Sequence, residues 1–288
     1  MARPYFMVIG APGTGKSYEM LKALQDAYVI FTGKNNGHFY FTNLKKGKLD
    51  PKEYKLPKRM MLLESYGFGA TKEDYASIDT IEMQKGSVGA DGQPLPISAM
   101  RRVDGLIDVL IKKTREAAEA GQPPPYANVI IDEAGELLAR VYAEILPTCL
   151  TNSGAQDVRG AFLQTENWVL AFSNKLRLLN SYGVGVGLVF HDREPDERAK
   201  GGAAAPSRGI ARKLAAATDA TLMRYMMDFE EEIDVGGKKV KKRKARRFWD
   251  GRASETWDIK LRGLDDDELD QITQMELVDI LPFAGFDM

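Results

Sequence analysis

Apolar runs alternate with amphipathic segments along most of this chain of 288 residues. Runs rich in β-branched, aromatic and other apolar residues predict strands at 5–9, 28–31, 38–41, 60–64, 78–83, 128–133, 184–191 and 217–225. Several of them are apolar at almost every position, which is typical of strands buried on both faces of a parallel sheet. Residues 98–120 and 157–179 predict helices between the strands. The alternation predicts an α/β fold with a mostly parallel central sheet flanked by helices.

The first predicted strand leads into a glycine-rich loop and then into a helical segment at 18–26. The loop reads Gly10-Ala11-Pro12-Gly13-Thr14-Gly15-Lys16-Ser17. Glycines permit a tight loop whose N–H groups converge, and a helix N-terminus adds a positive dipole end. Strand, loop and helix in this order predict a phosphate-binding P-loop that holds ATP through all eight residues. Lys16 would reach the β- and γ-phosphates, and the Ser17 hydroxyl would ligate Mg²⁺. A glycine-rich turn without a ligand is the alternative.

Three predicted strands end in carboxylate or imidazole side chains that are candidates for catalysis or metal binding. Residues 128–133 form a Walker B pattern, in which Asp132 would hold the Mg²⁺ shell and Glu133 could polarise the attacking water. Glu64 ends another strand and could orient or deprotonate water, or be a solvated carboxylate. His191 could sense the γ-phosphate or make only structural hydrogen bonds.

The C-terminal half contains two charged features. An acidic run at 228–234 and a basic run at 238–247 flank a Gly-Gly turn. The basic run could contact a phosphate backbone, or the two runs could pair as a hairpin whose charges compensate. Further on, Lys260 and Arg262 share one face of a predicted strand. They could reach a neighbour's nucleotide as fingers, or be part of a solvated edge strand.

Composition narrows the class of protein. A formal net charge of −1 gives no electrostatic case for the whole chain to bind nucleic acid or a membrane, so such a surface must be local. The single cysteine, Cys149, excludes an internal disulfide, and no apolar stretch approaches the length of a membrane span. We therefore expect a soluble protein of the cytoplasm, without a membrane partner.

The order of these motifs resembles that of phage RecA-like ATPases, the single-domain recombination or annealing proteins of bacteriophages. The resemblance covers residues 4–263, and only its Walker motifs are specific. It rests on the P-loop, Glu64-Ser65-Tyr66-Gly67, the Asp132 strand, Asp157-Val158-Arg159-Gly160-Ala161-Phe162, the His191 strand, Thr218-Asp219-Ala220 and Lys260-Leu261-Arg262. It implies a RecA-type core that hydrolyses ATP between protomers of a ring or filament and acts on single-stranded DNA. It also implies Glu64 as catalytic glutamate, His191 as sensor, the following loop as DNA-binding, and Lys260 and Arg262 as fingers across the interface.

One departure keeps other functions open. RecA-like proteins commonly follow the Walker B aspartate with a small hydroxyl residue, whereas Glu133 stands here, as in additional-strand ATPases and the FtsK/HerA translocases. The catalytic base is therefore either Glu133 or Glu64, and a DNA translocase or packaging motor is the second candidate. A nucleotide-binding structural subunit with little hydrolysis is a third. We expect an ATPase domain at 1–263, with an insertion near 33–58 and an antiparallel hairpin near 222–250, followed by an acidic tail at 264–288.

Overall fold

The computed structural model describes residues 3–33, 43, 46–50, 52, 54, 57–62, 81–82, 98–197, 200–235, 238–252, 256–261 and 264–287. Within these ranges nine strands form one sheet in the order β10-β9-β1-β6-β5-β2-β3-β4, with β11 also paired to β9. The strands are β1 (Tyr5–Ile9), β2 (Ala27–Phe31), β3 (Arg59–Leu62), β4 (Ile81–Glu82), β5 (Asn128–Asp132), β6 (Gly185–Val189), β9 (Ala220–Val235), β10 (Lys238–Asp250) and β11 (Lys260–Leu261). The predicted strand at 38–41 lies outside the described residues.

Every pairing from β9 through β1 to β4 is parallel, whereas β10 and β11 run antiparallel to β9. The predicted fold class is thereby confirmed: a mostly parallel sheet flanked by helices, with an antiparallel C-terminal extension. Strand β6 lies between β1, which leads into the P-loop, and β5, which ends in Asp132.

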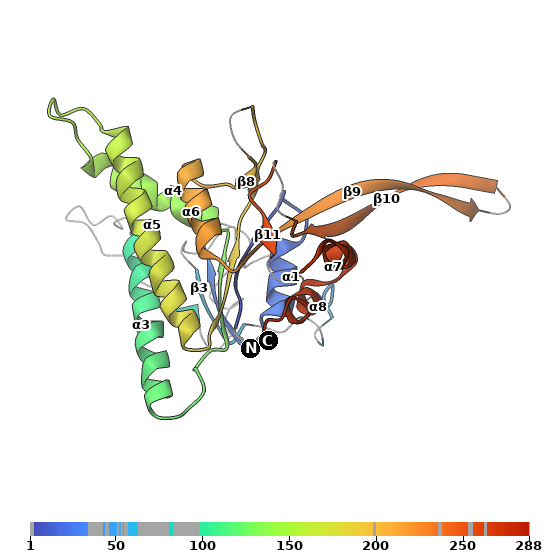
Figure 1. Cartoon of the computed structure of the whole chain (residues 1–288), viewed down its shortest axis with the longest axis horizontal. Helices are drawn as coiled ribbons and strands as arrows, with labels where there is room; N and C mark the ends of the chain where they lie inside the picture. Colours follow the sequence, from blue (N-terminus) through green and yellow to red (C-terminus); the bar gives the residue numbers. More distant parts are fainter. Residues whose placement is uncertain are drawn as a thin grey trace.

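Helices cover both faces of the sheet (Figure 1). They are α1 (Lys16–Ala23), α3 (Ala99–Glu119), α4 (Ala134–Ile145), η2 (Leu146–Thr148), α5 (Val158–Ser181), α6 (Arg208–Ala217), α7 (Asp266–Gln271), η3 (Ile272–Gln274) and α8 (Leu277–Phe283). Alternate β1 residues enter different cores: Tyr5 and Met7 pack in the core that α3 to α6 cover. Phe6 and Val8 pack in the core beneath α1 and α8. Burial on both faces explains why the strand is apolar throughout.

The C-terminal third adds two features to this body. Strands β9 and β10 form a long two-stranded ribbon that extends away from it (Figure 1). Residues 264–287, in the predicted acidic tail, contain α7, η3 and α8, and Ile272, Leu277 and Ile280 are fully buried in the core beneath α1. Within the described ranges no helix has the length and apolar character needed to span a membrane.

Candidate nucleotide-binding site

The P-loop connects the carboxyl end of β1 to the first turn of α1. Gly13 and Gly15 have φ angles of 80° and 87°, a backbone conformation that residues with a side chain rarely adopt. Helix α1 begins at Lys16, directly after Gly15, so its N-terminus faces the loop. A Cβ atom on Gly10 would lie 2.1 Å from the carbonyl oxygen of Arg224, so the loop also needs a glycine where it passes β9. The local sequence thus builds an anion-binding N-terminus.

Lys16 is buried under the loop that it follows. Its Nζ donates to the carbonyl oxygens of Gly10, at 2.7 Å, and Ala11, at 2.9 Å. Burial lowers the pKa of Lys16, and the carboxylates of Asp132, Asp192 and Glu133 oppose that shift. A phosphate oxygen entering the loop would compete with the two carbonyls for a desolvated ammonium group, which is a stronger electrostatic partner than a hydrated one.

Ser17 and Asp132 join the two Walker motifs. The Ser17 hydroxyl donates to Oδ1 of Asp132 at 2.7 Å, which connects α1 to the end of β5 across the sheet. Asp132 is 2% exposed. A hydroxyl and a carboxylate at this separation supply hard oxygen donors, the type that Mg²⁺ prefers. The residues present therefore fit a magnesium ion held beside the P-loop.

Glu133 has an unusual backbone. It is a non-glycine residue with a φ of 57°, at the N-cap of α4, a conformation that costs free energy and is concentrated at functional sites. The Thr32 hydroxyl donates to the carbonyl oxygens of Asp132, at 2.7 Å, and Glu133, at 2.5 Å, and so holds the turn to β2. The Glu133 side chain then lies against Gly33. This turn aims a carboxylate into the cavity beside the P-loop.

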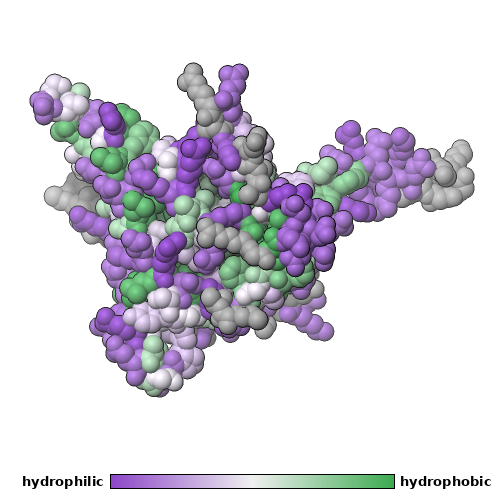
Figure 2. Space-filling model, in the orientation of Figure 1, coloured by the Kyte–Doolittle hydropathy of each residue, from purple (hydrophilic) through white to green (hydrophobic). Residues whose placement is uncertain are grey.

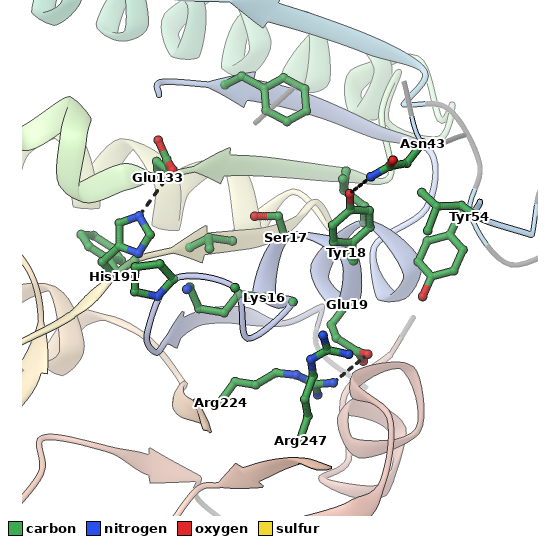
Figure 3. Close-up of a pocket in the computed structure, with 18 of the residues that line it drawn as sticks. Lys16, Ser17, Tyr18, Glu19, Asn43, Tyr54, Glu133, His191, Arg224 and Arg247 are labelled. Atoms are coloured by element: carbon green, nitrogen blue, oxygen red, sulfur yellow. Dashed lines mark hydrogen bonds and ion pairs between the residues drawn. The ribbon is translucent and has the colours of Figure 1, made fainter. Parts of the chain in front are cut away.

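His191 approaches that carboxylate from the neighbouring strand. Its Nε2 lies 3.4 Å from Oε1 of Glu133, and its side chain is 43% exposed (Figure 3). The backbone fixes the position of this segment, because the N–H of Asp192 donates to the carbonyl of Gly10 and the N–H of Ala204 donates to that of His191. A pair of this kind can hold a water molecule and respond to charge at the P-loop.

Two arginines enter from the ribbon. Arg224, on β9, is buried: its Nε donates to the Thr14 carbonyl at 3.1 Å and its guanidinium bonds Glu19 at 3.0 Å. The guanidinium also lies 4.4 Å from the ring centroid of Trp249. Burial lowers its pKa, and Glu19 opposes the shift. Arg247, on β10, is exposed, and its Nε would be 3.6 Å from a Cβ placed on Gly15. Arg224 thus supports the loop, whereas Arg247 borders the space above it.

These groups surround one cavity of about 830 Å³. Figure 3 shows Lys16, Ser17, Glu133 and His191 at one end, and Tyr18, Asn43 and Tyr54 at the other. At the second end the amide of Asn43 donates to the Tyr18 hydroxyl at 2.7 Å, and the rings of Tyr18 and Tyr54 meet edge to face. The P-loop and Lys16 thus form a cationic end of the cavity, and Tyr18 and Tyr54 form an aromatic end. This arrangement suits a molecule that carries phosphates and a planar ring.

The structure brings most of the sequence-predicted residues to this cavity and its rim. Pro12, Gly13, Gly15, Lys16, Ser17, Glu133 and His191 line it, and Gly10, Ala11, Thr14 and Asp132 bond directly to those groups or to the loop. Lys260 does not line it, because β11 pairs with β9 at Thr221, beside the ribbon. Glu64 and Arg262 lie outside the described residues, so their predicted roles stay predictions.

Residues at the site that were not predicted from the sequence include Thr32, Gly33, Arg224 and Arg247. The first two follow the β2 strand directly, and the polar Thr-Gly step at a strand end was a usable signal. The arginines carried no comparable signal. Arg224 is 210 residues away from Thr14 in the sequence, and it reaches the P-loop only because β9 pairs with β1.

Comparisons with known proteins add little to this geometry. No family model matches the chain, and no curated protein matches it. Among solved structures, a KaiC-like protein from the hyperthermophilic archaeon Pyrococcus horikoshii is similar, at 12% identity over 86% of this chain and 79% of that chain, with a TM-score of 0.38. At this identity and TM-score we draw nothing about the site or its function from the likeness.

Proposed function

We propose that this chain binds ATP with Mg²⁺, hydrolyses it, and acts on DNA, with single strands favoured. The observation that carries the ATPase proposal is the hydrogen bond of 2.7 Å between Ser17 and Asp132, made beside the buried Lys16. Further support comes from the cavity itself, which Lys16, Ser17 and Glu133 line together. The extra strand β6 between the two Walker strands supports a RecA-like core.

The residues divide the chemistry among them. Lys16 and the N-terminus of α1 bind the phosphates and stabilise the negative charge that grows during in-line attack. A magnesium ion held by Ser17 and Asp132 would neutralise further charge on the phosphates. Glu133 orients the attacking water and accepts its proton, while His191 holds the Glu133 carboxylate and reports the state of the loop. Glu133 lines the cavity, which supports it as the base, and Glu64 stays the alternative.

Steady-state ATP hydrolysis tests this function. The rate is measured without DNA, with single-stranded DNA and with duplex DNA, each at two salt concentrations. We expect hydrolysis that single strands stimulate and that salt suppresses, because phosphate contacts release counterions. A wild-type protein without ATP turnover under all these conditions would contradict the ATPase proposal. Turnover that no DNA stimulates would contradict the DNA proposal and favour a nucleotide-binding structural subunit.

A DNA translocase or packaging motor of the FtsK/HerA kind is the second candidate. The observation in its favour is that Glu133, at the sequence position where those motors usually carry a glutamate, lines the cavity. Stimulation of hydrolysis by duplex alone would favour the motor over a recombination or annealing protein. The same measurement therefore separates the two.

We also propose that the protein forms a homo-oligomer with ATP between protomers, where Lys260 and Arg262 act on the neighbour's nucleotide. Lys260 lies on β11, outside the lining of its own cavity, as a role in trans requires. Two inactive variants, Lys16→Ala and Lys260→Ala, are mixed for the test. Mixed oligomers contain some sites with both residues intact, so we expect partial recovery of hydrolysis. Mixtures that stay inactive would contradict a shared site.

A further inference from the structure

The ribbon formed by β9 and β10 has two different faces. Directly paired residues lie on the same side of an antiparallel pair, and sides alternate along each strand. One side, called the basic face here, carries the pairs Tyr225 with Phe248, Met227 with Arg246, Phe229 with Lys244, and Glu231 with Lys242. The other, called the mixed face, carries Met226 with Arg247, Asp228 with Ala245, Glu230 with Arg243, and Glu232 with Lys241.

Charge is distributed unequally between these faces. Among these eight pairs, the mixed face has three cations and three carboxylates, whereas the basic face has three cations and one carboxylate, Glu231. Where the ribbon joins the body, Asp250, paired with Met223, also lies on the side of the basic face. The acidic run thus compensates the basic run on one side of the ribbon and leaves the other positive. The alternation of the strands produces this separation, because Asp228, Glu230 and Glu232 are two residues apart.

Contacts between side chains follow the same division. On the mixed face Lys241 pairs with Glu230 at 3.1 Å. On the basic face Lys244 pairs with Glu231, whose pKa is lowered first by the hydrogen bond from Lys244 and further by the charges of Arg246 and Lys242. Within the described part of the chain, Lys242 and Arg246 make no ion pair of their own. The positive charge of this face is therefore available to a ligand.

Aromatic rings complete the basic face. Phe248 stacks on Tyr225 with centroids 5.6 Å apart and meets Phe229 at 5.7 Å, and the Arg246 guanidinium lies 5.8 Å from the Phe229 ring. Phe229 and Met227 nevertheless remain 38% and 47% exposed. Figure 2 shows hydrophobic surface on the inner part of the ribbon and hydrophilic surface farther out. A flat exposed ring beside cations suits a base stacked next to its phosphates.

We infer that the basic face of the ribbon binds single-stranded DNA. Lys242 and Arg246 contact the phosphates, and Phe229 supports a base. The inference rests on the proposed function, because it names the surface through which that ATPase meets DNA. Charge complementarity selects a polyanion, and the exposed aromatic ring selects a strand whose bases are unpaired. The mixed face of the same strands carries Arg247 toward the nucleotide cavity, so DNA and nucleotide contact opposite sides of one ribbon.

The test compares two matched double variants of the full chain. Lys242→Ala with Arg246→Ala removes two cations from the basic face, and Lys241→Ala with Arg243→Ala removes two from the mixed face of the same strand. Binding of a fluorescent oligothymidylate is followed by anisotropy over a series of salt concentrations. We expect the first variant to lose about tenfold or more in affinity and its salt slope to fall by about 1.4, at ~0.7 for each lost phosphate contact. The second variant changes affinity less than about twofold.

A third variant separates stacking from charge. Phe229→Leu keeps the charges and should weaken binding by about tenfold without changing the salt slope, because stacking releases no counterions. All three variants should keep the rate of ATP hydrolysis measured without DNA, since none of the five residues lines the cavity. That rate also checks that each variant is folded.

Several results would overturn the inference. Equal losses in the two double variants would mean that the total charge of the ribbon, and not one face, attracts DNA. An unchanged affinity in the basic-face variant would place the DNA elsewhere while leaving the proposed function intact. Duplex DNA that displaces the oligothymidylate at lower concentration would overturn the single-strand assignment. An active wild-type ATPase that binds no oligonucleotide would end both this inference and the DNA part of the proposed function.

Discussion

Gly33 leaves the space that the Glu133 carboxylate fills. A Cβ atom on Gly33 would lie 1.3 Å from Oε2 of Glu133, so no side chain fits there unless the carboxylate moves. The adjacent Thr32 holds the backbone of the same turn through its hydrogen bonds to the carbonyls of Asp132 and Glu133. The end of β2 thus acts on Glu133 twice, by fixing its backbone and by shaping the space around its side chain.

Gly33→Ala should therefore separate nucleotide binding from hydrolysis. The added methyl group displaces the Glu133 carboxylate, and loss of a positioned general base lowers turnover by about 100-fold or more. ATP affinity should stay within a few fold, because Gly33 does not line the cavity. Single-turnover hydrolysis and equilibrium binding of a fluorescent ATP analogue measure the two quantities.

Gly105→Ala is the matched control for that substitution. Gly105 lies within α3, and a Cβ there meets nothing within 4 Å. Alanine should stabilise the helix by ~0.5–1 kcal/mol and leave turnover unchanged. If Gly33→Ala hydrolyses ATP as fast as this control, the Glu133 carboxylate is not the group that positions water.

Lys16→Met should abolish ATP binding without destabilising the protein. Methionine is similar in length, and it removes a buried ammonium whose pKa is lowered by desolvation. In the wild type the folded-state pKa of Lys16 lies below its value in the unfolded chain, so the unfolded state binds more protons and stability from this group rises with pH. The stability advantage of the variant over wild type should accordingly shrink as pH increases toward 10.5.

Urea unfolding at several pH values, together with ATP binding by calorimetry, checks this prediction. A variant that binds ATP normally would remove Lys16 from the phosphate site. A variant that loses stability at every pH would mean that the hydrogen bonds from Lys16 to Gly10 and Ala11 outweigh the cost of burying its charge.

The sequence was sufficient for the parts of the site that local order determines. A strand, a glycine-rich loop and a helix N-terminus are contiguous in the chain, so the spacing from Gly10 to Ser17 predicted the loop directly. Asp132 and Glu133 were recognisable because parallel strands end at one edge of the sheet. The contact of Glu133 with Gly33 is different, since it depends on β2 and β5 being neighbours and on one missing methyl group.

The ribbon and α6 show two other limits. From the sequence alone, the acidic and basic runs could either compensate each other or leave a positive surface, because the outcome depends on the pairing register of β9 and β10. No element was predicted for residues 208–217, although Ser207 caps α6 and Ile210 and Leu214 have helical spacing. The charge compensation could not be predicted because it depends on which residues share a face of the ribbon. The second limit was a missed local signal.

Arg224→Ala should destabilise the fold. The guanidinium neutralises Glu19, whose other oxygen accepts the N–H of Leu277, so the pair joins β9, α1 and the start of α8. The side chains of Arg224 and Glu19 are only 9% and 12% exposed. Removing one partner leaves a buried charge, which costs about 3–5 kcal/mol. Chemical denaturation measures the loss, and a change below ~1 kcal/mol would show that water replaces the arginine.

Arg247→Ala should lower activity without destabilising the fold. Arg247 is exposed beside Gly15, so its loss leaves the free energy of unfolding nearly unchanged. We expect a reduction of about tenfold in turnover or in ATP affinity, because a cation that borders the phosphate end is removed. Steady-state kinetics separate the effects on kcat and KM. Wild-type values of both kcat and KM would mean that Arg247 does not act on the bound nucleotide.

Tyr5→Phe should flatten the loss of stability at alkaline pH. The Tyr5 hydroxyl bonds the buried Ser173 at 3.1 Å, and burial raises the pKa of Tyr5 from 10.0 to about 12. A raised pKa means that the neutral phenol stabilises the folded state fully below pH 10, and that this contribution disappears as pH rises through 12. At ~1.4 kcal/mol per pH unit, Tyr5 alone accounts for about 3 kcal/mol over that interval. The variant lacks one hydrogen bond and should be about 1 kcal/mol less stable at pH 8.

Urea unfolding of both proteins from pH 8 to pH 12 measures this difference, and every other tyrosine titrates equally in the two and cancels. The stability curves should therefore converge and then cross as pH rises. Parallel curves would mean that the phenolate of Tyr5 is as well solvated in the folded protein as in the unfolded chain. That result would also require the core between β1 and α5, where Tyr5 meets Ser173, to open before the remainder of the sheet unfolds.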